Sequence, residues 1–206
     1  MKILLVDDHS LVRQGVRRLL AAIPDAEILE AATSHEALAQ FRQAKPDIVL
    51  LDISLAGASG LELLKRLLIE NPNVKVLMLS MHAEAQYAAR ALQAGARGYI
   101  SKGASAEELI LGVQRVAEGK KYVEREIATD LAIKQFSGDG DVLDRLSMRE
   151  MEILRLLGEG KSMMTIANTL GVAYKTIANS CSTMKTKLAV ERTADLIRMA
   201  IEMKKS

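Results

Sequence analysis

The sequence predicts two domains: an α/β domain with a five-stranded, doubly wound parallel sheet, followed by a small all-α domain of four helices. Three observations support this. Short apolar runs alternate with longer amphipathic segments over residues 1–119, the polar stretch 137–141 interrupts the pattern, and no strand signal follows it. The length of 206 residues suits one large domain or two small ones. With 49% apolar and 26% charged residues, the composition excludes a disordered chain.

The expected strands are short runs rich in Val, Ile and Leu. Their apolar residues are continuous rather than alternating, which is typical of strands buried on both faces of a sheet. We expect strands at Lys2–Val6, Glu27–Ala31, Asp47–Leu51, Val74–Leu79 and Gly98–Ser101.

Amphipathic segments between these runs predict helices near 10–22, 34–44, 59–70, 84–94 and 105–118. Ser105 and Glu108 have the spacing of a capping box, and Gly95 and Gly119 stand where glycines end helices. Five strand–helix units in succession imply an open parallel sheet covered by helices.

The rest of the chain reads as helices. Residues 120–136 are expected to be helical or partly ordered, and the break at 137–141 is the best domain boundary. We therefore assign residues 1–119 to the first domain, 120–143 to a linker and 144–206 to the second domain. Four helices are expected in the second domain, at about 147–159, 163–170, 174–188 and 193–204. A tight turn at Gly171 between the second and third of them gives a helix-turn-helix pattern.

The two domains differ in charge, although the formal net charge of the whole chain is only +2. Residues 1–119 hold 13 basic and 14 acidic side chains, whereas residues 144–206 hold 11 and 7. A basic tail domain favours contact with nucleic acid. With 3% aromatic residues and no Trp, modules that stack single-stranded bases are disfavoured.

The cysteine count and the hydropathy pattern indicate in which cellular compartment we expect the protein. A single cysteine, Cys181, excludes an internal disulfide and suits a reducing cytoplasm, where we expect the protein. The longest apolar stretches are of strand length, far short of the roughly 18–20 residues of a membrane span. The first residues lack the pattern of a signal peptide, so we expect no membrane partner.

Polar side chains follow the expected strands at their carboxyl ends. Asp7 and Asp8 follow the first strand, Asp52 the third and Ser80 the fourth, while Tyr99 and Lys102 mark the end of the fifth. The carboxyl ends of strands in an open α/β sheet form the ligand-binding edge. Carboxylates crowded there repel one another, and Mg²⁺ relieves the repulsion while leaving one carboxylate free to attack a phosphoryl group. For any single acid, a solvated loop position is the alternative reading.

These residues resemble the receiver domain of bacterial two-component response regulators. The resemblance rests on Leu4–His9, Ile48–Asp52, Leu77–His82 and Ala94–Lys102. It implies that Asp52 accepts a phosphoryl group from a sensor histidine kinase, while Lys102 and Ser80 bind phosphoryl oxygens.

The resemblance also implies a metal site and a switch. Asp8, Asp52 and the carbonyl oxygen of Ser54 would bind Mg²⁺, with Asp7 acting mainly through water. Ser80 and Tyr99 would be the switch pair, with Tyr99 turning inward as Ser80 moves toward the phosphoryl group. One departure is Ala56, where many relatives have a proline that restricts the loop.

The tail resembles the LuxR-type helix-turn-helix of the NarL-like response regulators. The resemblance rests on Leu146–Glu150, Gly160–Ser162, Ile166–Ala167, Leu170–Val172, Lys175–Ile177 and Lys187–Leu188. At 100° per residue, Ile177, Cys181, Met184 and Leu188 form the core face of the third helix. The expected DNA contacts are Lys175, Thr176, Asn179, Ser182, Lys185 and Lys187, with the lysines on phosphates and Asn179 on adenine.

Departures from the LuxR-type pattern cluster in this domain. Thr165 replaces the usual acidic residue, Ala178 and Ser182 replace residues that are often basic, and Ser180 replaces a histidine. These substitutions predict weak DNA affinity and leave the sequence preference open.

The leading hypothesis is a response regulator in which phosphorylation of Asp52 controls dimerisation and DNA binding to regulate transcription. It is not an enzyme, beyond assisting its own Mg²⁺-dependent phosphorylation and dephosphorylation. One alternative is a phosphorylation-dependent adaptor whose degenerate helix-turn-helix binds protein, as Ala178 and Ser182 suggest. Another is a magnesium phosphohydrolase with a transient aspartyl phosphate, although the sequence shows no separate general base.

Overall fold

The computed structural model describes residues 1–55, 58–81, 85–137 and 145–203. The chain divides into two compact units, residues 1–138 and 139–206. Each unit has its own buried apolar core.

The first unit is built on one parallel sheet of six strands in the order β2-β1-β3-β6-β7-β8. The strands are β1 (Lys2–Val6), β2 (Glu27–Ala31), β3 (Ile48–Asp52), β6 (Val76–Ser80), β7 (Gly98–Ser101) and β8 (Tyr122–Val123). The predicted doubly wound parallel sheet is confirmed. Only β8 was not expected, because two residues are too short to give a strand signal. Two short antiparallel strands of two residues each, β4 (Ser54–Leu55) and β5 (Ala58–Ser59), follow β3.

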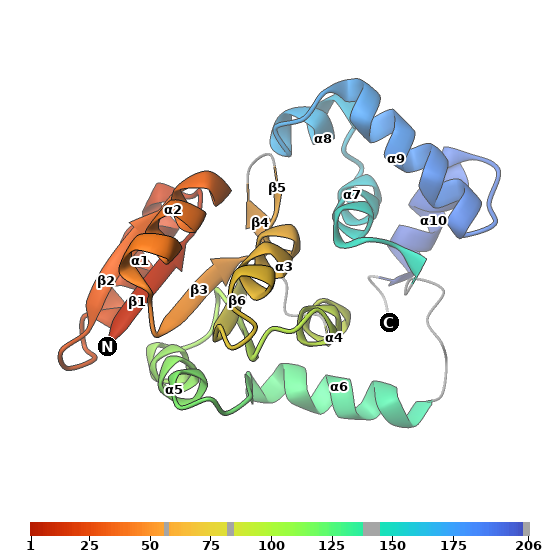
Figure 1. Ribbon diagram of the computed structural model, residues 1–206. Coiled ribbons are helices and arrows are strands. Elements are labelled where there is room, and N and C mark those ends of the chain that lie inside the picture. The colour runs from red at the N-terminus through yellow and green to blue at the C-terminus, as the bar shows by residue number, and fades with distance from the viewer. Residues whose placement is uncertain (56–57, 82–84, 138–144, 204–206) are drawn as a thin grey trace. The chain divides into compact units, whose positions relative to one another are not determined.

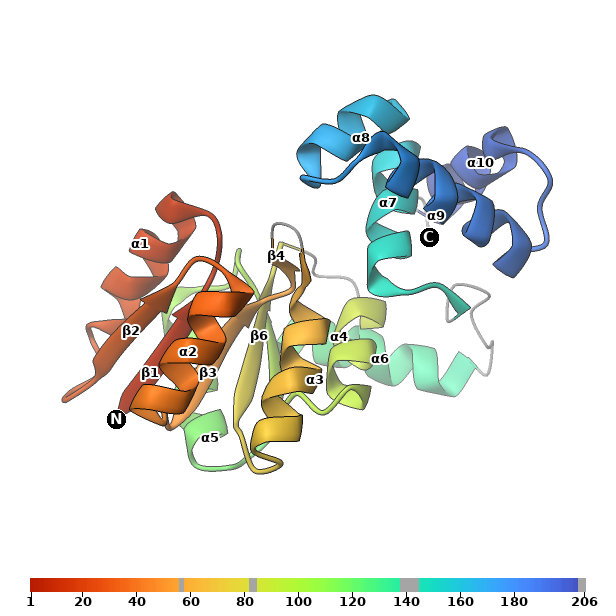
Figure 2. The ribbon, with the colours of Figure 1, turned by 45° about the horizontal axis from the view of Figure 1, so that its top comes forward.

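Helices cover both faces of this sheet, as Figures 1 and 2 show. They are α1 (Ser10–Leu20), α2 (Ser34–Ala44), α3 (Gly60–Glu70), α4 (Ala85–Gln93) and α5 (Ala106–Ala117). Their ends fall within two residues of the predicted ones. Gly95 and Gly119 have φ of +105° and +84°, so the predicted left-handed ends after α4 and α5 are confirmed.

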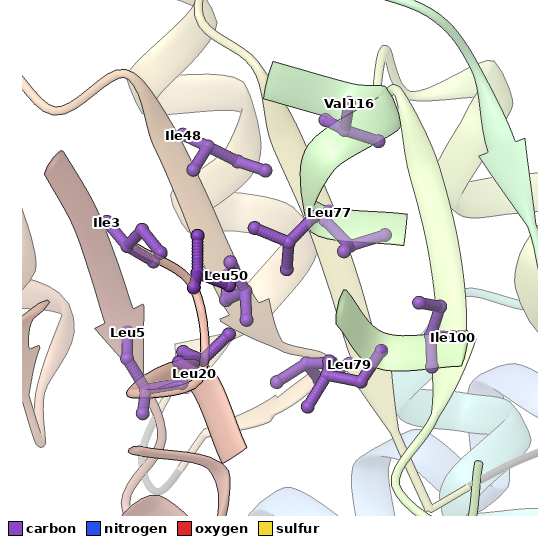
Figure 3. Close-up of a cluster of buried hydrophobic side chains, with 12 residues drawn as sticks. Ile3, Leu5, Leu20, Ile48, Leu50, Leu77, Leu79, Ile100 and Val116 are labelled. Carbon is purple, nitrogen blue, oxygen red and sulfur yellow. The ribbon is translucent and has the colours of Figure 1, made fainter. Parts of the chain in front are cut away.

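A buried apolar core holds helices α1 and α5 against the sheet of the first unit. Figure 3 shows alternate residues of β1, β3 and β6, such as Ile3, Leu50 and Leu77, meeting Leu20 of α1 and Val116 of α5. All five side chains are fully buried. Because the intervening residues of the same strands are also buried, the sheet has apolar contacts on both faces, as the continuous apolar runs predicted.

Much of the segment predicted as a linker belongs to the first unit. β8 pairs with β7, and α6 (Arg125–Ser137) contacts α4. The buried carboxylate of Glu124 accepts a 2.7 Å hydrogen bond from the backbone N–H of Ser101, and its own N–H donates to the carbonyl oxygen of Tyr99. Ile127 is buried as well. These contacts attach this part of the predicted linker to the first unit, and residues 138–141 of the predicted break lie outside the described ranges.

The second unit confirms the prediction of a small all-α domain. Its described helices are α7 (Met148–Gly158), α8 (Met163–Thr169), α9 (Tyr174–Lys187) and α10 (Thr193–Met203). Gly171, with φ of +62°, makes the turn between α8 and α9. Ile177, Cys181 and Met184 face the core from α9, as the helical periodicity predicted. Burial raises the pKa of the Cys181 thiol, which therefore acts as a small apolar side chain.

Glu150 ties the start of α7 to the end of α9. Its carboxylate accepts hydrogen bonds from the backbone N–H of Ser147, completing the predicted capping box, and from Nζ of Lys187 at 2.7 Å. Burial alone would raise the pKa of Glu150, but the bonds from Lys187 and Ser147 outweigh it and lower that pKa. The charged form of Glu150 is therefore favoured in the folded domain.

No helix within the described ranges is both long and apolar enough to cross a lipid bilayer.

The Glu150→Gln substitution should destabilise the second unit by about 1–2 kcal/mol, because it removes the ion pair with Lys187. Amide hydrogen exchange of α7 and α9 in the full chain would measure this as faster exchange. Since the folded pKa of Glu150 is lowered, its contribution is complete above the usual carboxyl pKa of about 4.3 and is lost as pH falls below it. Glu202→Gln, on the exposed end of α10, is the control. Equal exchange in the two variants would contradict the prediction.

Candidate functional site

The site lies at the carboxyl edge of the first unit's sheet, as predicted. Strands β1, β3, β6 and β7 are neighbours in the sheet order. Asp52 and Ser80 are the last residues of β3 and β6, Asp7 directly follows β1, and Lys102 directly follows β7. The side chains of Asp7, Asp52 and Lys102 are at most 5% exposed. Parallel pairing therefore brings together polar groups from four strands, and the side chains of Asp7, Asp52 and Lys102 are buried there.

The ammonium group of Lys102 joins two of the carboxylates. Its Nζ atom lies 2.7 Å from Oδ2 of Asp7 and 2.7 Å from Oδ2 of Asp52. The backbone N–H of Lys102 donates to the carbonyl oxygen of Ser80, which fixes the start of the loop after β7. One cation thus offsets the repulsion between two buried anions.

The pKa of Asp52 reflects this balance. Burial raises it, Lys102 lowers it, and the neighbouring charge of Asp7 raises it again, so that the pKa of Asp52 is about 6. Burial also acts to lower the pKa of Lys102, but the carboxylates of Asp52 and Asp7 raise it above its usual value. At neutral pH the Asp52 carboxylate is therefore mostly ionised and lies beside a charged lysine.

The loop after β3 positions Asp52. The backbone N–H of Ser54 donates to Oδ1 of Asp52, and the N–H of Gly60 donates to the carbonyl oxygen of Ile53. A Cβ atom at Gly60 would lie 2.0 Å from the carbonyl oxygen of Asp52, so only glycine fits at the start of α3. Ala56 of this loop lies outside the described residues.

The donor set fits a hard divalent cation. Asp7, Asp8, His9 and Asp52 each offer a ligand atom, and these atoms lie within 4.8 Å of one another. Three of the four are carboxylate oxygens, the ligands that Mg²⁺ prefers. The residues that the structure describes at this edge therefore match the predicted magnesium site in chemistry.

Two residues beside the site, His9 and Arg13, were not predicted to have a role there. Nδ1 of His9 lies 3.0 Å from Oδ1 of Asp8. Arg13 donates to the carbonyl oxygen of Asp7 at 2.7 Å and to Glu30 at 3.0 Å, so it fixes the loop between β1 and α1. In the sequence, Arg13 lies in the first turn of the helix that follows Asp8, and this position could have indicated a contact with the site.

Ser80 and Tyr99, the predicted switch pair, are both fully buried. They lie on the adjacent strands β6 and β7, in which Met78 pairs with Tyr99 and Ser80 with Ser101. The side chain of Tyr99 is therefore buried in this structure, and the movement of the pair stays a prediction.

The second unit presents the residues predicted to contact DNA on α9. Lys175, Thr176, Asn179 and Ser182 are exposed, and Lys185 is half-buried. Lys187 differs, because its ammonium group is bound to Glu150.

Two protein families match this chain. Residues 3–114 match the family described as "Response regulator receiver domain", and residues 144–200 match "Bacterial regulatory proteins, luxR family". The two matches cover the two units in the order in which the sequence resemblance placed them.

Relatives and solved structures extend over nearly the whole chain. The chain is 37% identical to "Transcriptional activator protein ExaE" of Pseudomonas putida, covering 98% of this chain and 96% of ExaE. It is 33% identical to "Response regulator UvrY" of Escherichia coli K12, covering 98% and 94%. A structure of two RcsB dimers bound to two parallel DNAs has 25% identity and a TM-score of 0.62, covering 96% of each chain.

Replacing Asp52 by Asn should stabilise the first unit at pH 7 in a buffer without divalent cations. The substitution removes a buried charge whose pKa is raised to about 6, and Lys102 keeps Asp7 as its partner. We expect a gain of about 1–3 kcal/mol in the free energy of unfolding, measured by hydrogen exchange of the sheet amides. The control is Asp130→Asn, on the exposed face of α6. A loss of stability, or no difference from the control, would contradict the charge balance described above.

Proposed function

This chain belongs to the bacterial two-component response regulators with a LuxR-type helix-turn-helix domain, and we propose that phosphorylation of Asp52 controls its binding to DNA. The family is one of transcription regulators rather than classical enzymes. The observation that supports the proposal most directly is the buried carboxylate of Asp52, which shares the ammonium group of Lys102 with Asp7.

The phosphoryl donor in this proposal is a phosphohistidine of a sensor kinase. An oxygen of the ionised Asp52 carboxylate attacks phosphorus, the N–P bond breaks, and its electron pair stays on the departing imidazole. An aspartyl phosphate remains on Asp52. Lys102, already bound to Oδ2 of Asp52, lies where it can bind an oxygen of the incoming phosphoryl group, and Ser80 binds another.

Magnesium is the cofactor that we propose for this step. Asp8, Asp52 and the carbonyl oxygen of Ser54 would hold the ion, with Asp7 acting mainly through water. The cluster of carboxylate oxygens supports this assignment. When bound, the ion supplies positive charge that offsets the carboxylates and the phosphoryl oxygens. The same groups would assist the later dephosphorylation of Asp52.

We propose a conformational switch that links phosphorylation of Asp52 to strand β7. Ser80 moves toward the phosphoryl group, which favours the inward phenol of Tyr99. Two contacts of Glu124 with β7 would carry this shift to α6, because its N–H binds the Tyr99 carbonyl and its carboxylate binds the Ser101 N–H. The helix that leads out of the first unit is thereby attached to the strand that bears the switch residue.

The second unit is the proposed DNA-binding domain, with functional limits at 144–206 and the receiver at 1–119. Lys175, Thr176, Asn179, Ser182 and Lys185 would contact DNA, whereas Lys187 has a structural role through Glu150. A homodimer on DNA is part of the proposal, supported by the RcsB dimers on DNA. The match of residues 144–200 to the luxR family supports DNA over the protein-binding adaptor. A cytoplasmic location, with Cys181 reduced, completes the proposal.

Incubation with radiolabelled acetyl phosphate and Mg²⁺ should label the wild-type chain and leave Asp52→Asn unlabelled. The reason is that Asp52 supplies the attacking oxygen. Asp130→Asn should be labelled normally, and Asp8→Asn should need more magnesium because it loses a proposed ligand. Label in the Asp52→Asn variant at the wild-type level would show that another group accepts the phosphoryl group.

The salt dependence of DNA binding should separate two lysines of α9. Lys175→Ala should reduce the slope of log affinity against log salt by about 1, because an exposed lysine releases one counterion when it meets a phosphate. Lys187→Ala should leave the slope unchanged and loosen α7 and α9, because its ammonium group is held by Glu150. Fluorescence anisotropy with a duplex probe measures the slopes. An equal loss of slope in both variants would place Lys187 on the DNA instead.

A further inference from the structure

The outward face of α9 has an unusual chemistry for a helix that meets DNA. Its exposed residues are Tyr174, Lys175, Thr176, Asn179, Ser182, Thr183 and Thr186. The face thus carries a phenol at the helix start, one ammonium group, one amide and several small hydroxyl side chains. The helix contains no arginine.

Arginine and lysine make the commonest base-specific contact in the major groove, a bidentate bond to guanine. In α9, Lys187 is held by Glu150 and Lys185 is half-buried at the edge of the face. Lys175 remains on the face, one residue inside the helix start. Beyond the first turn of α9, the cations Lys185 and Lys187 are therefore only partly exposed, and both lie near the C-terminal end of the helix.

The middle of the face offers the groups that recognise A·T pairs. Asn179 is exposed there, and an asparagine amide forms a bidentate pair with N6 and N7 of adenine. The hydroxyl of Thr183 donates to the backbone carbonyl oxygen of Asn179 at 3.1 Å. With its proton used inside the helix, Thr183 presents its methyl group, and the methyl of Ala178 lies half-buried on the other side of Asn179. Such methyl groups contact the C5-methyl of thymine.

These groups are spaced for neighbouring base pairs. Residues 178–183 rise about 7.5 Å along the helix at 1.5 Å per residue, which is about two steps of a duplex at 3.4 Å each. The N-terminal residues of a recognition helix reach base edges, and Ala178 and Asn179 lie in the N-terminal half of α9, with Thr183 one turn further along.

We propose that α9 reads a run of two or three A·T base pairs in each half-site, with Asn179 on adenine and the methyl groups of Ala178 and Thr183 on thymine. This proposal rests on the DNA-binding function proposed above and adds the class of sequence that is bound. It also accounts for Ala178 and Ser182, which stand where related domains often have basic residues and so lower the charge of this face.

The test begins with selection of duplexes from a random pool by the full-length chain, phosphorylated and in low salt. Affinities are then measured by anisotropy on the selected duplex, on versions with single A·T pairs replaced by G·C, and on versions with thymine replaced by uracil. Uracil keeps every hydrogen-bonding group of thymine and lacks only the methyl, so it isolates the methyl contact.

We expect an A·T run in the selected half-site, and single G·C replacements within it should weaken binding roughly 5- to 150-fold, as for loss of a good base contact. Asn179→Ala should lose the discrimination at one adenine. Thr183→Ser, which keeps the hydroxyl and drops the methyl, should no longer distinguish thymine from uracil at one position, whereas the wild type should.

Matched controls lie on α8. Thr169 is exposed, and its hydroxyl makes the same kind of bond, to the carbonyl oxygen of Thr165, so Thr169→Ser should retain the wild-type sensitivity to uracil. Asn168→Ala should retain discrimination at adenine. A selected half-site of G·C pairs, or binding to every duplex without base preference, would overturn this proposal and leave DNA binding intact. Binding to no duplex in low salt would overturn both.

Discussion

The proposed phosphorylation site depends on one arrangement, a lysine held between two buried aspartates at the carboxyl edge of a parallel sheet. The sheet order puts β1 beside β3 and β6 beside β7, so Asp7, Asp52 and Lys102 meet with N–O distances of 2.7 Å. Burial disfavours the ionised form of Asp52 and so raises its pKa, and Lys102 offsets this increase only in part. A site with an excess of buried negative charge is one that a metal ion and a phosphoryl transfer can change strongly.

The same edge is linked to more distant parts of the first unit by backbone bonds. Lys102 donates to Ser80, Glu124 accepts from Ser101, and Arg13 holds the carbonyl of Asp7. Each of these bonds joins the site to a different element, namely β6, the start of α6 and α1. In the second unit, Glu150 has the corresponding role, because it joins the start of α7 to Lys187 at the end of α9.

Much of the fold and of the site could be predicted from the order of residues in the sequence, and most of the exceptions depend on contacts between residues far apart in it. Continuous apolar runs gave the five principal strands, and the rule that strand ends share an edge brought Asp7, Asp52 and Lys102 together. Glu124 and Ser101 are 23 residues apart, and Lys187 and Glu150 are 37 apart. Such pairs leave no local pattern, so the docking of α6 and the internal role of Lys187 could not be predicted. β8 is too short to show periodicity.

The central claim is that the state of Asp52 sets the affinity of the second unit for DNA. The most direct test is to measure the anisotropy of one duplex probe with the full chain in Mg²⁺, before and after addition of acetyl phosphate to the same sample. The account predicts that affinity rises in the wild type and stays constant in Asp52→Asn. An affinity that does not change in the wild type, or that rises equally in Asp52→Asn, would contradict it.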